Sequence, residues 1–169
     1  MENRHIHTWW VQNWDSPGWQ TAWAQLISDV PQIIEKSGVE LAGPSGDPSV
    51  ENPIMVDFEK SIAFKGAHGV TNDTFYFLPE WPSSYNPVGL PFDAMYTINT
   101  AGLPYDAVVT CILLRAWEIG QDDFDVGSRA GYARWRPGCE LYKSIWSNYP
   151  IELMWGVTED IGQESGERI

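Results

Sequence analysis

The sequence has few basic residues. Only ten of its 169 residues are Lys or Arg, against 23 Asp and Glu, which gives a formal net charge of −13 at pH 7. A chain this acidic repels nucleic acids and anionic membranes at long range, so we expect no direct binding to nucleic acid. The excess of carboxylates has three interpretations: solubility, adaptation to high salt, or mimicry of nucleic acid toward a basic protein.

Cysteine and long apolar runs are also scarce. Two cysteines, Cys111 and Cys139, do not make the disulfide framework of a small secreted protein. No apolar stretch approaches the roughly 18 residues that a membrane span needs, and the first residues lack the charged and apolar segments of a signal peptide. We therefore expect no membrane association and a cytoplasmic location, in a bacterium or in a host cell.

The familiar motifs of catalysis and cofactor binding are missing too. The chain has no Walker loop, no dinucleotide-binding glycine pattern, no His-Glu-x-x-His and no Gly-x-Ser-x-Gly. Asp122, Asp123 and Asp125 precede Gly127, but a calcium loop would need Glu where Arg134 stands. We therefore predict no catalytic residue, no metal site and no cofactor. The sequence favours a protein without enzymatic activity but does not decide the question.

Aromatic residues, by contrast, are abundant, with ten Trp, seven Tyr and six Phe. One domain of this size cannot easily bury ten Trp, so we expect some of them to line a groove or an interface. The apolar spacing after residues 15–17 (Asp-Ser-Pro) predicts a helix that ends at Gly38. Pro31 is expected to break or kink that helix near Ile27, because proline has no N–H for the helical ladder.

The rest of the pattern predicts a mixed fold. Period-two alternation and turn signals indicate strands at residues 4–13, 54–64, 74–78, 92–98 and 124–127. A nearly all-apolar helix is expected from Pro104 to Gly120, and a last helix from Pro137 to Trp146. This order predicts a single α+β domain over residues 1–155, with a mainly antiparallel sheet and about three helices packed on one face. Residues 156–169 are expected to form an acidic, flexible tail.

Three short motifs occur between residues 54 and 147. They are Ile62-Ala63-Phe64-Lys65-Gly66, Thr100-Ala101-Gly102-Leu103-Pro104-Tyr105-Asp106, and Gly127-Ser128-Arg129-Ala130-Gly131. With these motifs the chain resembles a family of small uncharacterised proteins of bacteria and their phages. The family pattern has charged residues where Asn99, Gly102 and Ala130 stand here, so a site built on those charges would be lost in this chain. The resemblance implies a bacterial or phage setting and no particular activity.

Arginine and aromatic residues interleave in one stretch, which we predict to be a loop before the last helix. Together with one Trp of the preceding helix they form the candidate ligand-binding set: Arg129, Tyr132, Arg134, Trp135, Arg136 and Trp117. A guanidinium beside an aromatic plane can hold a phosphate or a nucleobase. The alternative is that the arginines pair with nearby carboxylates and steady the loop.

Two smaller patterns have a chemical and a structural interpretation. His5 and His7 lie two apart on the first predicted strand and face the same side, as a metal-binding pair would. The sequence indicates no third ligand, so two surface histidines on an edge strand is the preferred interpretation. Asp57 and Glu59 likewise favour the polar side of a strand over an acid–base pair.

Two functions of different classes remain. The first is a non-enzymatic interaction protein, encoded by a phage or mobile element, whose acidic surface binds and inhibits a basic host protein, with nucleic-acid mimicry as one means. A nucleic-acid-binding protein would be a suitable partner. The alternative is a binder of small ligands or nucleotides, or an enzyme, with a pocket lined by arginine and aromatic residues. We favour the first, and carboxylates scattered evenly over the surface would count against mimicry.

Overall fold

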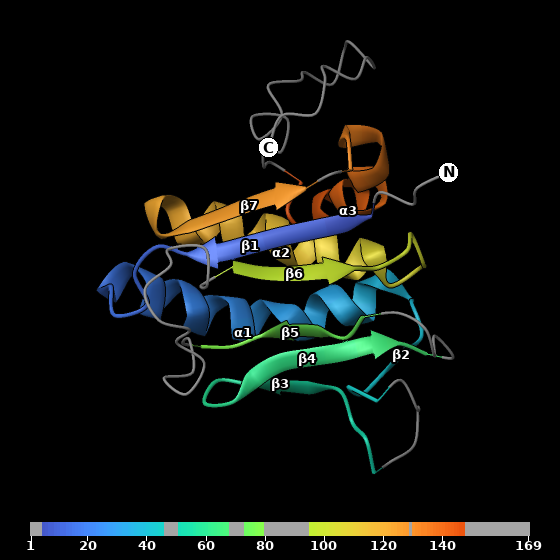
Figure 1. Ribbon diagram of the computed structural model, residues 1–169, viewed down its shortest axis with the longest axis horizontal. Coiled ribbons are helices and arrows are strands. Elements are labelled where there is room, and N and C mark those ends of the chain that lie inside the picture. The colour runs from blue at the N-terminus through green and yellow to red at the C-terminus, as the bar shows by residue number, and fades with distance from the viewer. Residues whose placement is uncertain (1–4, 46–50, 68–72, 80–94, 129, 148–169) are drawn as a thin grey trace.

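A computed structural model describes residues 5–45, 51–67, 73–79, 95–128 and 130–147 (Figure 1). Within these residues, three α-helices and seven strands form a mixed α+β domain with antiparallel sheets, which confirms the predicted fold class. The elements are β1 (Ile6–Val11), α1 (Pro17–Ser37), β2 (Leu41–Ala42), β3 (Met55–Asp57), β4 (Ser61–Gly66), β5 (Phe75–Phe77), β6 (Met95–Asn99), α2 (Asp106–Gly120), the 3-10 helix η2 (Gln121–Asp123), β7 (Phe124–Ser128) and α3 (Tyr132–Ile145). The expected tail lies outside the described residues.

The strands form two sheets rather than one. β1 is the middle strand of the order β6-β1-β7, while β4 pairs with β2, β3 and β5 in the second sheet. Asp73, just before β5, connects the sheets, because its carboxylate accepts the N–H of Asn99 at the end of β6 at 2.8 Å. Figure 1 shows α2 and α3 behind the first sheet, and α1 between β6 and β5.

Helix α1 begins and ends where the sequence predicts. Ser16 is the N-cap and its hydroxyl accepts the N–H of Trp19, while Gly38 ends the helix in the left-handed conformation at φ 63°. The predicted interruption at Pro31 is wrong, since the helix continues to Ser37. Pro31 is exposed, so the carbonyl that it leaves without a donor lies on the solvated side of the helix.

The core between helices and sheets is built of aromatic rings. Trp19 of α1 stacks on Phe77 of β5 and Phe124 of β7, with ring centroids 5.9 and 5.8 Å apart. Of the eight Trp residues in the described ranges, Trp9, Trp19, Trp23 and Trp135 are buried, and Trp10, Trp14, Trp117 and Trp146 are half-buried. The described Trp residues therefore mostly pack inward, and the expected open groove lined with Trp is not found among them.

β4 has less contact with water than the alternation indicated. β4 is buried along its whole length, including Ser61 and Lys65 on the side expected to be wet. Asp57 ends β3 and its carboxylate accepts the N–H groups of Glu59 and Lys60, so it shapes a turn rather than forming an acid–base pair.

Among the helices in the described ranges, none combines the length and apolar character that a membrane crossing requires.

Candidate functional site

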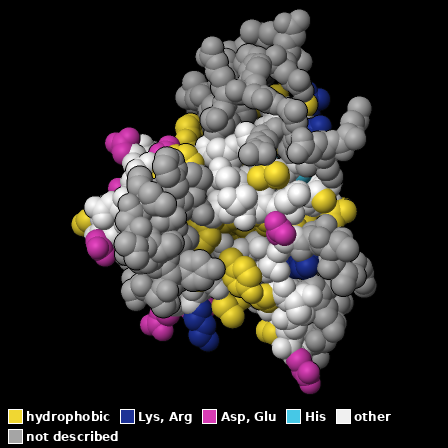
Figure 2. All heavy atoms as spheres, viewed as in Figure 1, with side chains coloured by type: hydrophobic (Ala, Val, Ile, Leu, Met, Phe, Trp, Pro, Cys, Tyr) yellow, Lys and Arg dark blue, Asp and Glu magenta, His cyan; other side chains and the backbone are white. Residues whose placement is uncertain are grey.

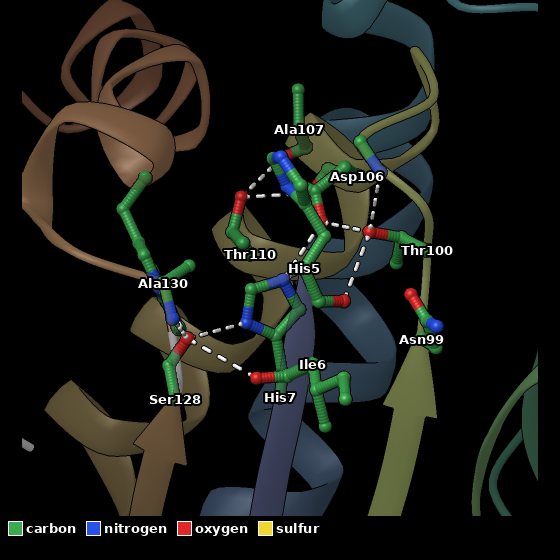
Figure 3. Close-up of polar contacts among 12 residues, drawn as sticks. His5, Ile6, His7, Asn99, Thr100, Asp106, Ala107, Thr110, Ser128 and Ala130 are labelled. Atoms are coloured by element: carbon green, nitrogen blue, oxygen red, sulfur yellow. Dashed lines mark hydrogen bonds and ion pairs between the residues drawn. The ribbon is translucent and has the colours of Figure 1, made fainter. Parts of the chain in front are cut away.

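A buried set of polar side chains joins β1 to the start of α2 and the end of β7 (Figure 3). We call it the histidine network: His5, His7, Thr100, Asp106 and Ser128. His7 is 0% exposed, and its Nε2 lies 2.8 Å from Asp106 Oδ1 while its Nδ1 lies 2.9 Å from Ser128 Oγ. The Thr100 hydroxyl donates to the same carboxylate oxygen. The network therefore connects the start of the chain to two segments that lie about a hundred residues further along it.

The carboxylate of Asp106 fixes the hydrogen-bonding roles of His7. An ionised carboxylate only accepts, so Nε2 of His7 carries a proton and donates it to Oδ1. In the neutral imidazole, Nδ1 then accepts from the Ser128 hydroxyl. Serine, histidine and aspartate thus follow one another in the connectivity of a hydrolytic triad.

The surroundings of Ser128 oppose a catalytic role. Its Oγ accepts the backbone N–H of Ala130 at 2.9 Å and the indole N–H of Trp135 at 3.0 Å. A hydroxyl oxygen has two lone pairs, and both are engaged by these donors. Its proton faces His7 or, at 3.3 Å, the carbonyl of Ile6. An oxygen bonded in this way is a poor nucleophile, so the geometry favours a structural role that fixes α3 to the end of the sheet.

His5 completes the network from the partly exposed side. Its Nδ1 is buried without a hydrogen bond and lies 3.6 Å from Asp106 Oδ2. The ring packs against Gly102, where an added Cβ would lie 2.7 Å from His5 Nε2. Gly102 also has φ 70°, a conformation that side chains with a Cβ rarely adopt. The absence of a side chain at Gly102 therefore makes room for His5.

The predicted pair of surface histidines on an edge strand is wrong. β1 is the central strand and His7 is buried, because His5 and His7 share the side of β1 that carries Trp9 and Val11. Asp106 does approach both histidines, but no group of His, Cys, Asp and Glu in the described part of the chain is arranged to hold a metal ion. The alternation alone contained the signal, since histidines in phase with core residues point into the core.

The predicted arginine and aromatic stretch lies on a helix and not in a loop. α3 begins at Tyr132, five residues before the predicted start at Pro137. Residues two apart on a helix do not face each other, so Arg134 and Arg136 diverge, while Arg136 lies on the same side of α3 as Tyr132, four residues before it. Arg134 and Arg136 are exposed, whereas Trp135 is 0% exposed and its ring faces are covered by the core.

The other members of the predicted set do not complete a site in the described structure. Tyr132 is half-buried at the start of α3, and Trp117 is half-buried on α2. Arg129 lies outside the described residues. In the described structure Arg134 and Arg136 are exposed, but the ring of Trp135 is buried and offers them no aromatic face.

One arginine that the prediction did not include joins all three helices. Arg115 on α2 donates to Asp29 on α1 at 2.6 Å and to the Tyr142 hydroxyl on α3 at 3.2 Å. Its guanidinium also lies 4.2 Å from the ring centroid of Trp146. Burial opposes the charge of Arg115, but the hydrogen bonds to Tyr142 and Asp29 outweigh it and raise the pKa of the guanidinium. We call Asp29, Arg115, Tyr142 and Trp146 the helix clamp.

Four carboxylates gather where β1 leads into α1 and η2 leads into β7, at the left of Figure 1. We call Asp15, Asp122, Asp123 and Asp125 the acidic end. The Gln12 backbone donates to the Asp123 carbonyl at 2.8 Å, and the Ser16 hydroxyl donates to the Asp123 carboxylate at 2.8 Å. The Gln12 side chain donates to Asp125.

The donors at the acidic end are neutral. No Lys or Arg in the described ranges forms an ion pair with any of its four carboxylates, in contrast to Asp29 in the helix clamp. Asp15 and Asp122 are exposed, and Asp123 and Asp125 are half-buried. Uncompensated charges of one sign at one end of a molecule create a local negative potential.

Comparison with known proteins gives no relative. No family model, no curated protein and no solved structure matches this chain. Its function is therefore inferred from its own residues. On the face drawn in Figure 2, the acidic side chains stand apart from one another and do not form a continuous stripe.

Proposed function

We propose that this protein is a non-enzymatic interaction protein that binds a basic segment of another protein through its acidic end. One observation carries the proposal: Asp15, Asp122, Asp123 and Asp125 lie on neighbouring segments, and the hydrogen bonds to the carboxylates of Asp123 and Asp125 come from neutral groups. Because no cation of the described chain neutralises them, their charge is available to attract Lys and Arg of a partner. Net charge adds to this local effect, since −13 favours basic partners at long range.

The class of partner follows from the same charges. A basic protein that itself binds nucleic acid carries clustered Lys and Arg, which complement four neighbouring carboxylates. The resemblance to small bacterial and phage proteins favours a bacterial partner. Nucleic-acid mimicry is not part of the proposal, because it would need a regular row of carboxylates, and the acidic side chains visible on the face drawn in Figure 2 form no such row.

The alternative of a ligand-binding or catalytic site has weaker support. The hydroxyl of Ser128 is saturated by N–H donors, and the rings of Trp135 are covered. Arg134 and Arg136 remain available on the surface of α3, but exposed arginines without a second group bind anions weakly.

A charge-matched pair of variants tests the proposal. The triple variant Asp15→Asn, Asp122→Asn, Asp125→Asn removes three charges at the acidic end and leaves Asp123 to hold Ser16. Glu35→Gln, Glu59→Gln, Glu140→Gln is the control, because these exposed side chains lie elsewhere and remove the same charge. Tagged full-length proteins would be used to isolate partners from a bacterial lysate at about 0.15 M and about 1 M salt, where ionic contacts are screened.

The partner that the wild-type protein retains would then be purified and titrated against each variant. We expect the acidic-end variant to lose about tenfold in affinity, at roughly 0.5 kcal/mol for each exposed charge, and the control to lose much less. Equal losses in the two variants would show that only the overall charge matters, and the acidic end would then not be a binding site.

A further inference from the structure

Among the described strands, β7 is an edge strand of its sheet, and it lies beside the acidic end. β7 pairs with β1 on one side, and no other described strand pairs with it, as Figure 1 shows at the top of the sheet. The hydrogen bond from Gln12 N–H to the Asp123 carbonyl sets the alternation of the ladder, so Asp125 and Gly127 bond to β1. The backbone groups of Val126 and Ser128 consequently point to the outer edge.

The described residues of β7 lack three of the devices that discourage strand addition, namely proline, lysine and a bulge. Natural edge strands are often interrupted by proline, by lysine or by a bulge. The sequence of β7, Phe-Asp-Val-Gly-Ser, contains neither proline nor lysine, and its pairing with β1 runs through five consecutive residues without a bulge. An extended segment can therefore add to it through backbone hydrogen bonds.

We propose that the partner of this protein contributes an extended, basic segment that pairs with the outer edge of β7 as a fourth strand of the β6-β1-β7 sheet. The inference rests on the proposed function and specifies how the partner binds. The side chain of Asp125 lies on the face of the sheet that points away from the core, and Asp125 pairs in register with Trp10 of β1. A Lys or Arg opposite Asp125 forms a cross-strand ion pair, and further basic residues of the segment reach Asp122 and Asp123.

Charge complementarity favours a basic segment at the edge of β7 over two other candidates, a second copy of the chain and the chain's own residues 156–169. A second copy of the chain would bring together two molecules of net charge −13. The segment 156–169 carries Glu159, Asp160, Glu164 and Glu167 against a single Arg168, so it too has the wrong sign for the acidic end. A basic segment from another protein is the occupant that the edge and its neighbouring charges favour.

Three synthetic ten-residue peptides test the pairing with the full-length protein. The first alternates Lys and Val, and the second has Glu in place of Lys. The third is the Lys peptide with N-methyl groups on two adjacent central residues, so that each of its edges loses a donor. We expect the Lys peptide to bind, the Glu peptide not to bind, and N-methylation to weaken binding about tenfold, as the loss of a backbone hydrogen bond predicts.

Amide hydrogen exchange locates the contact. The Lys peptide is expected to slow exchange at Val126 and Ser128, with no change at the edge strand β3, which serves as the internal control. Protection at β3 instead of β7 would overturn the proposal, and so would equal binding of the methylated and unmethylated peptides. In the second case the acidic end could still bind a basic partner through side chains, so the proposed function would stand.

Charge reversal at one residue provides an independent readout. Asp125→Lys is expected to weaken binding of the Lys peptide and to permit binding of the Glu peptide, because the cross-strand pair then has the opposite sign. Glu59→Lys is the matched control, since it makes the same change of charge at an exposed position away from β7. If both variants change peptide preference equally, the segment does not lie beside Asp125 and the edge assignment is wrong.

Discussion

The histidine network and the helix clamp are both polar clusters that join three segments of the chain, but their most buried members differ in access to water. In the network, His7 and Thr100 are 0% exposed, while the side chains of Asp106 and His5 keep 9% and 18% of their surface exposed. In the clamp, the side chains of Arg115 and Asp29 keep 14% and 11% of their surface exposed. A buried group that loses its partner cannot turn to water, whereas a partly exposed one can. Burial, more than the number of hydrogen bonds, should therefore decide what each cluster contributes to stability.

Removing the central carboxylate of the network should have the largest effect. Asp106→Ala leaves the Nε2 of His7 and the hydroxyl of Thr100 buried without their acceptor. We expect the free energy of unfolding to fall by about 2–5 kcal/mol, because each buried polar group left without a partner costs roughly 1–3 kcal/mol. Denaturant unfolding followed by Trp fluorescence measures the loss, which should be nearly the same at low and high salt.

The control for this change is the double variant His7→Leu, Asp106→Leu. If unpaired polar groups cause the loss, removing both partners should cost less than the sum of the single changes His7→Leu and Asp106→Leu. A loss below about 1 kcal/mol for Asp106→Ala would mean that water reaches the network, and the contrast with the clamp would disappear.

Breaking the clamp should have a smaller and salt-dependent effect. Arg115→Ala removes the ion pair with Asp29, the hydrogen bond to Tyr142 and the contact with Trp146. We expect a loss of about 1–2 kcal/mol, because solvent partly replaces the lost contacts. The control Arg115→Lys keeps the charge but not the planar guanidinium. Its free energy of unfolding should lie between those of the wild-type protein and Arg115→Ala. A loss as large and as insensitive to 1 M salt as that of Asp106→Ala would contradict the comparison.

The sequence contained more of the fold than of these clusters. Ser16 and Gly38 act within their own turns, so the ends of α1 can be read locally. The start of α3 was missed because Pro137 is typical of a first turn, yet Pro137 is exposed inside the helix, where an unpaired carbonyl can meet water. Local signals in the sequence therefore predicted the ends of a helix except where solvent can satisfy a backbone carbonyl that a proline leaves unpaired.

The histidine network could not be assembled from one sequence. His7 is separated from Asp106 by 99 residues and from Ser128 by 121, and no local spacing relates such positions. The phase of His7 with Trp9 predicts burial of its side chain, but the identity of its partner depends on the sheet order and on where α2 begins. Helix α3 shows the same limit of reading one sequence. Arg134 and Arg136 are only two residues apart in the chain, but their side chains point in different directions because they lie on a helix.

The smallest expected effect compares two tyrosines in alkali: Tyr105, which lies next to Asp106 of the network, and Tyr142 of the clamp. Burial raises the pKa of Tyr105, and the carboxylates of Asp73 and Asp106 raise it further. Burial also raises the pKa of Tyr142, but there Arg115 opposes the rise. A tyrosine that stays protonated in the folded state while it ionises in the unfolded chain stabilises the fold fully below its ordinary pKa of 10.0, and that stability is lost as the pH rises above it.

At pH 10 the loss from Tyr105 should be about 0.4 kcal/mol, and it should grow as the pH rises further. Tyr105→Phe should therefore flatten the fall of unfolding free energy between pH 9 and 11 more than Tyr142→Phe does, since a guanidinium opposes the rise in pKa only at Tyr142. Urea unfolding at several pH values measures both slopes, each variant serving as the control for the other. A steeper change for Tyr142→Phe would mean that Arg115 does not hold its charge against the Tyr142 hydroxyl, and the clamp would then be held mainly by packing.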